Sequence, residues 1–258
     1  MSGEDFLDVA RAIVENSGSI VRGYRRNRIV REKTPGDPVT EGDLEVEQYV
    51  LSELHRAYPD HGFDSEERGQ EREDAEYVWI LDPIDGTKYY ARGVPIYSIS
   101  LALRHRGELI LGVVFSPETR QMFSAGKGQP ATLNERPIRC SETARLDDAI
   151  LCVEFPSRDR PAEQRRAALE KLGLLMDQAR RVRAIGVGAL GLCFCAANGF
   201  DAYVNLGNGS KEWDLAAGRA ILEAAGGQFL RFGPTVVAGP PALCRQLVTL
   251  LGLDRRAV

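Results

Sequence analysis

The sequence predicts a protein of mixed α and β structure, with an α+β first part and an alternating α/β second part. Two observations carry this prediction. Apolar residues recur at helical spacing near the N-terminus, and short runs of β-favouring residues replace them from Tyr77 onward. From about Ala149 the predicted strands and helices alternate, which is typical of an α/β unit. We therefore place a boundary near residue 145, between an N-terminal part (1–145) and a C-terminal part (146–258).

Two helices are expected in the first part, one from Phe6 to Tyr24 and one from about Thr40 to Ala57. The polar stretch between them, residues 25–38, contains the breaker Pro35-Gly36-Asp37-Pro38 and is expected to be a loop. The acidic and arginine-rich stretch 64–76 shows no regular pattern. Thr40 and Asp43 have the spacing of a capping box, with Asp in place of the usual Glu or Gln.

The strands of the first part begin with the continuous run Tyr77–Leu81, which we expect to stop at Asp82-Pro83 and lead into a turn. Strands at 98–103 and 109–115 flank Arg106-Gly107 and predict a hairpin. Two short strands are expected at 122–125 and 131–133. In the second part, strands are predicted at 149–155, 182–185, 200–204 and 228–230, and helices at 161–179, 188–197 and 212–225.

Composition excludes several classes of function. Lys and Arg number 33 against 37 Asp and Glu, a net charge of −4, so no cationic face for a nucleic-acid polymer is evident. No apolar run is long enough to span a membrane, and the N-terminal segment is acidic, unlike a signal peptide. Cys193 and Cys195 fall in an apolar helical run, as buried thiols of a reducing compartment do. These features predict a cytoplasmic protein.

The segment Trp79–Thr87 is the most informative for chemistry. It places Asp82 and Asp85 three positions apart at a strand end, followed by Gly86-Thr87. Carboxylate oxygens are the ligands that Mg²⁺ prefers, and free N–H groups at a following helix start would bind an anion. One short motif thus offers a metal site beside a phosphate site. The alternative is an ordinary acidic turn that caps a helix, and the segment alone leaves both open.

Three other acidic positions each have an ordinary structural explanation as well. Glu66-Glu67 reads as a solvated cluster, Asp43 as a capping residue, and Asp214 as an acid at a helix start. Competing motifs are absent from the sequence. Pro83 stands where the Asp-x-Asp-Gly-Thr motif of haloacid-dehalogenase-type phosphatases needs its nucleophile, and no Walker loop, Gly-x-Ser-x-Gly elbow or zinc-type histidine spacing occurs.

Taken together and in order, these segments resemble the inositol monophosphatase family. Residues 82–87 are similar to its central DPIDGT motif, and Trp213–Gly218 resembles its WDxAAG motif. Glu66-Glu67 falls where the family has Gly-Glu-Glu, and Asp37–Asp43 where it has Pro-Val-Thr-x-x-Asp. The likeness extends from about Phe6 to Leu230.

The resemblance implies a fold and an activity. The fold would be the layered αβαβα sandwich of the inositol monophosphatase and fructose-1,6-bisphosphatase type, usually a homodimer. The activity would be that of a magnesium-dependent, often lithium-sensitive phosphomonoesterase with two or three Mg²⁺ ions per site. A small phosphorylated metabolite, with inositol monophosphate as the first guess, would be hydrolysed by attack of a metal-activated water.

The resemblance also implies roles for individual residues. Glu66, Asp82 and the Ile84 carbonyl would hold the first ion, and Asp82, Asp85 and Asp214 the second, with Glu66 reaching a third through water. Thr87, paired with Asp43, would help to activate the attacking water. The substrate would be bound by the Gly86 and Thr87 N–H groups together with Asp85, Gly188 and Asn205.

Three departures from the family pattern bear on which substrate the protein would recognise. Asn205 stands where inositol monophosphatases have a Glu that binds ring hydroxyls, and the stretch 206–212 is about two residues longer. Val187 replaces a Thr of the substrate segment. Lys88 replaces the commoner Thr and is either a contact for a second phosphate or a solvated surface charge. The alternatives are therefore 3′-phosphoadenosine 5′-phosphate, histidinol phosphate, fructose 1,6-bisphosphate, or a non-catalytic member that only binds metal.

Overall fold

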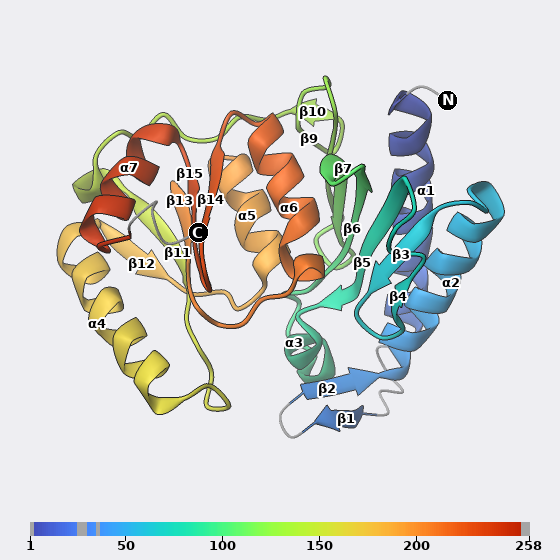
Figure 1. The fold of residues 1–258 in the computed structure, drawn as a ribbon, viewed down its shortest axis with the longest axis horizontal. Helices are drawn as coiled ribbons and strands as arrows, with labels where there is room; N and C mark the ends of the chain where they lie inside the picture. The colour runs from blue at the N-terminus through green and yellow to red at the C-terminus, as the bar shows by residue number, and fades with distance from the viewer. Residues whose placement is uncertain (1–2, 25–29, 35–36, 254–258) are drawn as a thin grey trace.

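The protein is a sandwich of five layers in the order helices, sheet, helices, sheet, helices (Figure 1). The computed structural model describes residues 3–24, 30–34 and 37–253. The layered arrangement confirms the predicted αβαβα fold. The larger sheet is built from residues 62–137 and the smaller from residues 150–239, so the predicted boundary at 145 lies between them.

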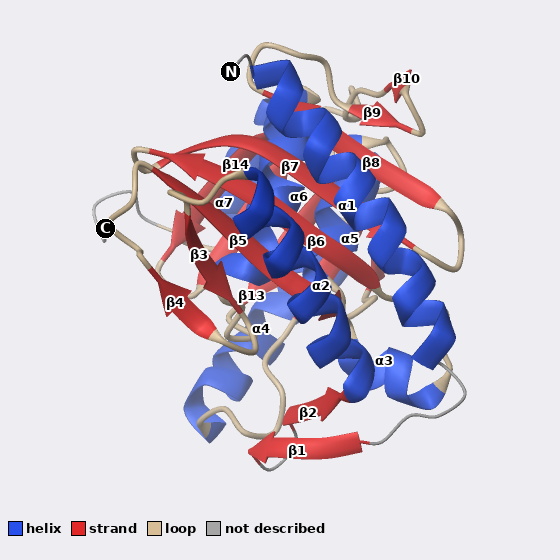
Figure 2. Ribbon diagram, turned by 90° about the vertical axis from the view of Figure 1, so that its right-hand side faces the viewer, coloured by secondary structure: helices blue, strands red, loops and turns tan. Residues whose placement is uncertain are grey.

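The larger sheet has eight strands in the order β10-β9-β8-β7-β6-β5-β3-β4, antiparallel except for the pair β3 and β5. The strands are β3 (Gly62–Ser65), β4 (Gly69–Glu71), β5 (Tyr77–Asp85), β6 (Ser98–His105), β7 (Glu108–Ser116), β8 (Gln121–Gly126), β9 (Thr132–Leu133) and β10 (Arg136–Pro137). Its outer face is covered by α1 (Gly3–Tyr24) and α2 (Glu41–Ala57), as Figure 2 shows.

Side chains of β5 explain why its sequence reads as a continuous apolar run. Trp79 and Leu81 point to the core under α1 and α2, and Ile80 points to the core on the opposite face. Because successive strand residues face opposite sides, a strand buried on both faces has no polar alternation.

The smaller sheet has five strands in the order β12-β11-β13-β15-β14. The strands are β11 (Ile150–Glu154), β12 (Arg181–Arg183), β13 (Ala202–Leu206), β14 (Gln228–Phe232) and β15 (Thr235–Gly239), with β11 parallel to both β12 and β13. The face of this sheet that points away from α5 and α6 is covered by α4 (Ala162–Gln178) and α7 (Pro241–Leu250), and its apolar residues form a core with theirs. A short 3₁₀ helix, Leu146–Asp148, precedes β11.

The middle layer consists of α5 (Gly188–Ala196) and α6 (Glu212–Ala224), packed between the two sheets. Glycines allow the close approach of α6 to its neighbours. A Cβ at Gly112 of β7 would lie 2.4 Å from the Ala217 carbonyl oxygen, and one at Gly218 would lie 2.8 Å from Leu192 Cβ. The start of α6, which carries Asp214, is therefore fixed by tight packing on both sides.

Most predicted elements are confirmed with small shifts of their ends, but four local predictions are wrong or incomplete. Within the stretch 25–38, the described residues 30–34 and 37–38 are not a loop, because β1 (Val30–Thr34) and β2 (Asp37–Thr40) form an antiparallel pair beside α3 (Thr87–Arg92). Residues 25–29 and 35–36, which include part of the predicted breaker, lie outside the described residues. Strand β5 does not stop at Asp82-Pro83. The short strands β3 and β4 and the C-terminal pair of β15 and α7 were not anticipated from the sequence.

Two further observations bear on the composition argument. All five cysteines are free, and Cys193 and Cys195 are buried as expected. Within the residues that the structure describes, no helix has both the length and the apolar character needed to cross a membrane.

Candidate active site

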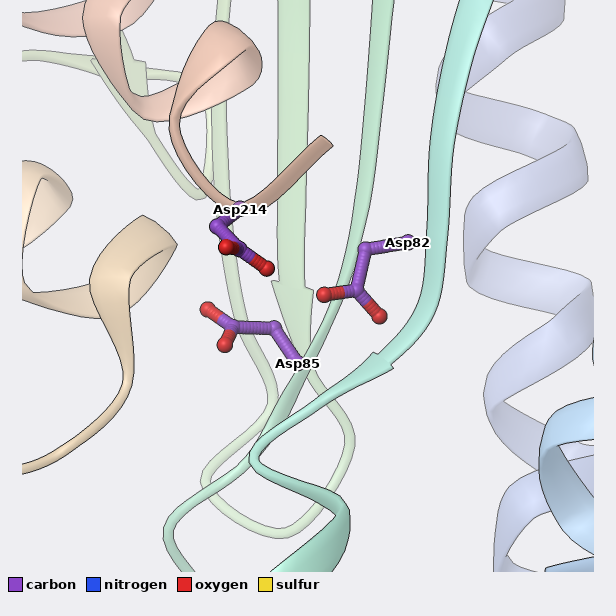
Figure 3. A group of neighbouring side chains, drawn as sticks. All are labelled: Asp82, Asp85 and Asp214. Carbon is purple, nitrogen blue, oxygen red and sulfur yellow. The ribbon is translucent and has the colours of Figure 1, made fainter. Parts of the chain in front are cut away.

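Three aspartates from distant parts of the chain meet at one point (Figure 3). Asp82 and Asp85 come from the end of β5, and Asp214 comes from the first turn of α6. One carboxylate oxygen of each lies within 4.8 Å of those of the other two. We call these three residues the acidic triad.

An irregularity in β5 turns its two aspartates toward the same point. The pairing of β5 with β6 shifts register between Asp82 and Asp85, because Pro83 has no N–H to donate to the ladder. The N–H of Ile84 donates instead to Asp82 Oδ1 at 3.0 Å. The strand therefore continues through the motif, where the sequence predicted a stop and a turn.

Backbone N–H groups hold the other two carboxylates. The N–H of Ala189, in the first turn of α5, donates to Asp85 Oδ2 at 2.8 Å. The N–H of Lys211 donates to Asp214 Oδ2 at 2.6 Å, at the start of α6. Both contacts use donors that a helix start leaves unpaired, so the middle layer positions two of the three aspartates.

Burial and like charge together raise the pKa values of Asp82 and Asp85. Burial raises the pKa of Asp82 well above its usual value, and the charges of Glu66, Asp85 and Asp214 raise it further. Burial is also the main cause of the raised pKa of Asp85, followed by the charge of Asp214. Buried carboxylates at this spacing need a cation to be stable in the charged form.

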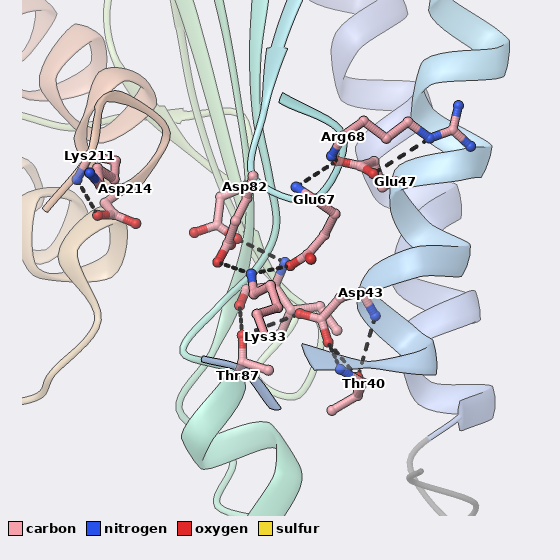
Figure 4. Close-up of polar contacts among 12 residues, drawn as sticks. Lys33, Thr40, Asp43, Glu47, Glu67, Arg68, Asp82, Thr87, Lys211 and Asp214 are labelled. Carbon is pink, nitrogen blue, oxygen red and sulfur yellow. Dashed lines mark hydrogen bonds and ion pairs between the residues drawn. The ribbon is translucent and has the colours of Figure 1, made fainter. Parts of the chain in front are cut away.

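Glu66 contributes to the raised pKa of Asp82 and is paired in this structure with Lys33, which also contacts Glu67 (Figure 4). Lys33 Nζ, on β1, donates to Glu66 Oε1 at 2.9 Å and to Glu67 Oε1 at 2.8 Å. Burial acts to lower the pKa of the lysine, but its contacts with both glutamates outweigh burial and raise it. Burial raises the pKa of Glu67 to about 7. No motif or spacing in the sequence indicated this lysine.

Thr87 and Asp43 are brought together as expected. The Thr87 hydroxyl is 3.2 Å from Asp43 Oδ1 and 3.0 Å from the Ile84 carbonyl oxygen, so its single proton has two acceptors. Asp43 Oδ2 accepts from the N–H and the hydroxyl of Thr40, which completes the predicted capping box of α2. Burial raises the pKa of Asp43 to about 6.

Two glycines of the predicted site have steric reasons to be glycine. Gly86 has a φ of +97°, and a Cβ there would lie 2.9 Å from the Ile96 carbonyl oxygen. At Gly188, the first residue of α5, a Cβ would lie 3.1 Å from the Asp214 carbonyl oxygen. Both glycines therefore let backbone pass close to the acidic triad.

Comparison with known proteins assigns the family. The model of the inositol monophosphatase family matches residues 3–250. The chain belongs to the inositol monophosphatase family. Among curated relatives, a protein of Pseudomonas aeruginosa named "Nus factor SuhB" is 33% identical, with 96% of each chain covered. An "Inositol-1-monophosphatase" of Mesorhizobium japonicum is 32% identical, covering 88% of this chain and 87% of the relative.

Solved structures agree with this assignment. An inositol monophosphatase from Anabaena has a TM-score of 0.84 at 28% identity, with 97% of each chain covered. The names of the family relatives thus fall into two groups, one enzymatic and one that describes no hydrolytic activity.

Asn205, which the resemblance assigns to substrate binding, is engaged within its own loop. Its side chain is 1% exposed. The Oδ1 atom accepts from the N–H groups of Gly207 and Asn208, and the Nδ2 group donates to Asn208 Oδ1 and Ser210 Oγ. Asn205 therefore fixes the conformation of the loop 207–211.

A polar cleft of about 980 Å³ opens beside Asp214 and Glu66. Its far wall is formed by two loops, residues 157–160 after β11 and residues 208–211 after β13. Neither Arg158 nor Arg160 was anticipated from the sequence. The only available signal was the extra length of the stretch 206–212, which supplies part of this wall.

Proposed function

We propose that the chain is a Mg²⁺-dependent phosphomonoesterase that acts on a small sugar or polyol phosphate. The observation that carries the proposal is the convergence of Asp82, Asp85 and Asp214, the first two of which are buried and have raised pKa values. Mg²⁺ prefers carboxylate oxygens and shares them with substrate phosphates. The family and the enzymatic names of several relatives support the same activity.

The donor set fits the cation. Asp82 and Asp85 are buried among like charges, so a divalent ion would relieve a repulsion that the protein alone does not neutralise. Asp82, Asp85 and Asp214 would hold one ion, and Asp82, Glu66 and the Ile84 carbonyl would hold another. Glu66 becomes available when Lys33 leaves it. Mg²⁺ bound there would lower the pKa of water and offset the charge of the phosphate.

The protein's own groups have distinct tasks in this proposal. The N–H groups of Gly86 and Thr87 would bind a phosphate oxygen at the start of α3. The Thr87 hydroxyl, hydrogen-bonded to Asp43 Oδ1, would orient the attacking water and pass its proton toward Asp43. Asp43 accepts that proton more readily because its pKa is raised to about 6.

Inositol monophosphate stays the first substrate to test, and sensitivity to Li⁺ and a homodimeric state belong to the same proposal. We would measure phosphate release by the purified protein with Mg²⁺ and with a chelator. The compounds are inositol 1-phosphate, fructose 1,6-bisphosphate, histidinol phosphate and 3′-phosphoadenosine 5′-phosphate. Mg²⁺-dependent release from one of them supports the proposal, and release from none by folded, Mg²⁺-binding protein contradicts it.

A second candidate is a family member that binds metal or a protein partner without turnover. The observation in its favour is that several relatives at 31–37% identity carry the name "Nus factor SuhB". Against it stands the completeness of the site, since Asp43, Glu66, Thr87 and all three triad aspartates are present. Mg²⁺-dependent hydrolysis that Asp85→Asn abolishes would exclude this candidate.

A further inference from the structure

The wall of the cleft opposite the acidic triad has a charge that the overall composition does not suggest. Besides Lys33, which is paired with Glu66 and Glu67, four cationic side chains line the cleft: Lys88, Arg158, Arg160 and Lys211. Asp159 is the only carboxylate among the lining residues apart from Glu66 and Asp214, which belong to the metal site. A chain with a net charge of −4 thus concentrates positive charge beside its candidate active site.

Strand topology explains how these cations come together. The loops 157–160 and 208–211 follow β11 and β13, which are adjacent and parallel, so both loops leave the same edge of the smaller sheet. Ligands commonly bind at this edge of parallel strands. Lys88 comes from α3, directly after Thr87, and lines the same cleft as the loop 157–160.

Arg160 is the best placed of the four cations. A Cβ on Gly209 would lie 1.9 Å from an Arg160 guanidinium nitrogen, so the guanidinium rests against a backbone that only glycine leaves open. Its Nε–H is buried and has no hydrogen-bond acceptor among the described residues. Its ion-pair partner among them is Asp159, at 3.6 Å. The Arg160 side chain as a whole is 37% exposed and lines the cleft, and a guanidinium in that position favours a bidentate oxyanion ligand.

We propose that Arg160, Lys88 and Lys211 form a second phosphate subsite, and that the preferred substrate is a small bisphosphate. The inference rests on the proposed phosphatase function, because the first phosphate is the one placed at the acidic triad. The cleft volume of about 980 Å³ leaves room for a second phosphorylated end. A sugar bisphosphate and a nucleoside bisphosphate share the required chemistry, and the experiment separates them.

The test compares matched pairs of compounds that differ by one phosphate. The pairs are fructose 1,6-bisphosphate with fructose 1-phosphate, and 3′-phosphoadenosine 5′-phosphate with adenosine 3′-monophosphate. We expect kcat/KM for the bisphosphate of one pair to exceed that of its partner at least about tenfold. Arg160→Gln should remove most of this preference through a higher KM and leave the monophosphate unchanged. Lys88→Gln should act in the same direction.

Arg166→Gln is the matched control, because Arg166 is exposed on α4 and does not line the cleft. Equal kcat/KM values within both pairs, or an equal loss on both members in Arg160→Gln, would overturn the subsite while leaving the phosphatase function intact. Circular dichroism of each variant checks that it is folded.

A binding measurement separates failure of the subsite from failure of the proposed function. Calorimetry in Mg²⁺ would compare the bisphosphates and monophosphates on Thr87→Val and on Thr87→Val/Arg160→Gln. If the wild type hydrolyses nothing but Arg160→Gln weakens bisphosphate binding about tenfold, the subsite stands and the hydrolase proposal falls. Equal binding of both members of each pair would overturn the subsite whether or not turnover occurs.

Discussion

Thr87 donates toward Asp43 Oδ1 at 3.2 Å and thereby connects the start of α3 with the first turn of α2, 44 positions earlier in the chain. The same hydroxyl lies 3.0 Å from the Ile84 carbonyl oxygen, a proposed metal ligand. One small side chain thus couples the buried carboxylate of α2 to the acidic triad. This connection gives a direct prediction.

Replacing Thr87 with Val should abolish hydrolysis by removing the hydroxyl, whereas Thr87→Ser should keep a substantial part of it. The side-chain volume is nearly unchanged in Thr87→Val, so the fold and Mg²⁺ binding should be retained. Steady-state kinetics of both variants would check this. Similar activities in Thr87→Val and the wild type would remove Thr87 from the mechanism.

The activity should also fall as the pH is lowered through about 6. Asp43 has its pKa raised to about 6 by burial, and it accepts the Thr87 proton only when it is ionised. The pH profile of kcat with saturating Mg²⁺ and substrate would show this acidic limb. An unchanged limb in Asp43→Asn would show that another group titrates there.

Asp85→Asn should lower hydrolysis by orders of magnitude and stabilise the metal-free protein. The amide removes one charge from a buried cluster, and relief of that repulsion should raise the free energy of unfolding by about 1 kcal/mol or more. Urea denaturation in a chelator and phosphate release with Mg²⁺ would measure the two effects. Asp74→Asn, at an exposed position, is the control and should change neither.

Stabilisation by Mg²⁺ should be larger at about pH 8 than at about pH 5.5. The pKa values of Asp82 and Asp85 are raised in the folded protein, so the folded chain binds more protons than the unfolded chain above about pH 4. Without metal, the free energy of unfolding should therefore decrease as the pH rises. Mg²⁺ opposes this loss because it binds the ionised carboxylates. Tm values with Mg²⁺ and with chelator at both pH values would test the prediction, and equal Mg²⁺ shifts would contradict it.

Lys33→Gln should lower the Mg²⁺ concentration needed for half-maximal activity about three- to tenfold. The ammonium of Lys33 is hydrogen-bonded to Glu66, a proposed metal ligand, and must leave before the ion binds there. The change corresponds to about 1 kcal/mol, as expected for a partly exposed ion pair. Lys127→Gln removes an exposed pair with Glu108 and serves as the control. This competition would be contradicted if the Mg²⁺ concentration needed for half-maximal activity fell in the control or rose in Lys33→Gln.

The repeating elements could be predicted from the sequence because their signals are local. Helical periodicity defined α1 and α2, and apolar runs defined β5, β6 and β7 within a few residues. The acidic triad followed from motif resemblance, since no spacing argument brings Asp214 to Asp82. The structure supplies the physical reason, which is the packing of α6 against β7 at Gly112.

The features that could not be predicted depend on contacts between distant residues. The strands β1 and β2 are short and mostly polar, so their sequences have no apolar alternation, and Lys33 on β1 contacts glutamates 33 and 34 positions away. Asn205 was assigned to substrate from its aligned position, but its partners lie in a loop whose conformation needs positive φ at Gly207 and Gly209. Strand β5 continues past Pro83 because its pairing with β6 shifts register there, so the ladder does not need an N–H from the proline.

Because Asn205 is buried and holds its loop from within, the wall of the cleft and the position of α6 depend on different contacts. The loop that it holds, residues 207–211, ends where α6 begins, and α6 is fixed by close contacts at Gly112 and Gly218. A substitution at residues 207–210 therefore alters the wall of the cleft, while Asp214 keeps its contact with the N–H of Lys211 at the start of α6. Such an arrangement lets this wall vary in sequence while the acidic triad keeps its geometry.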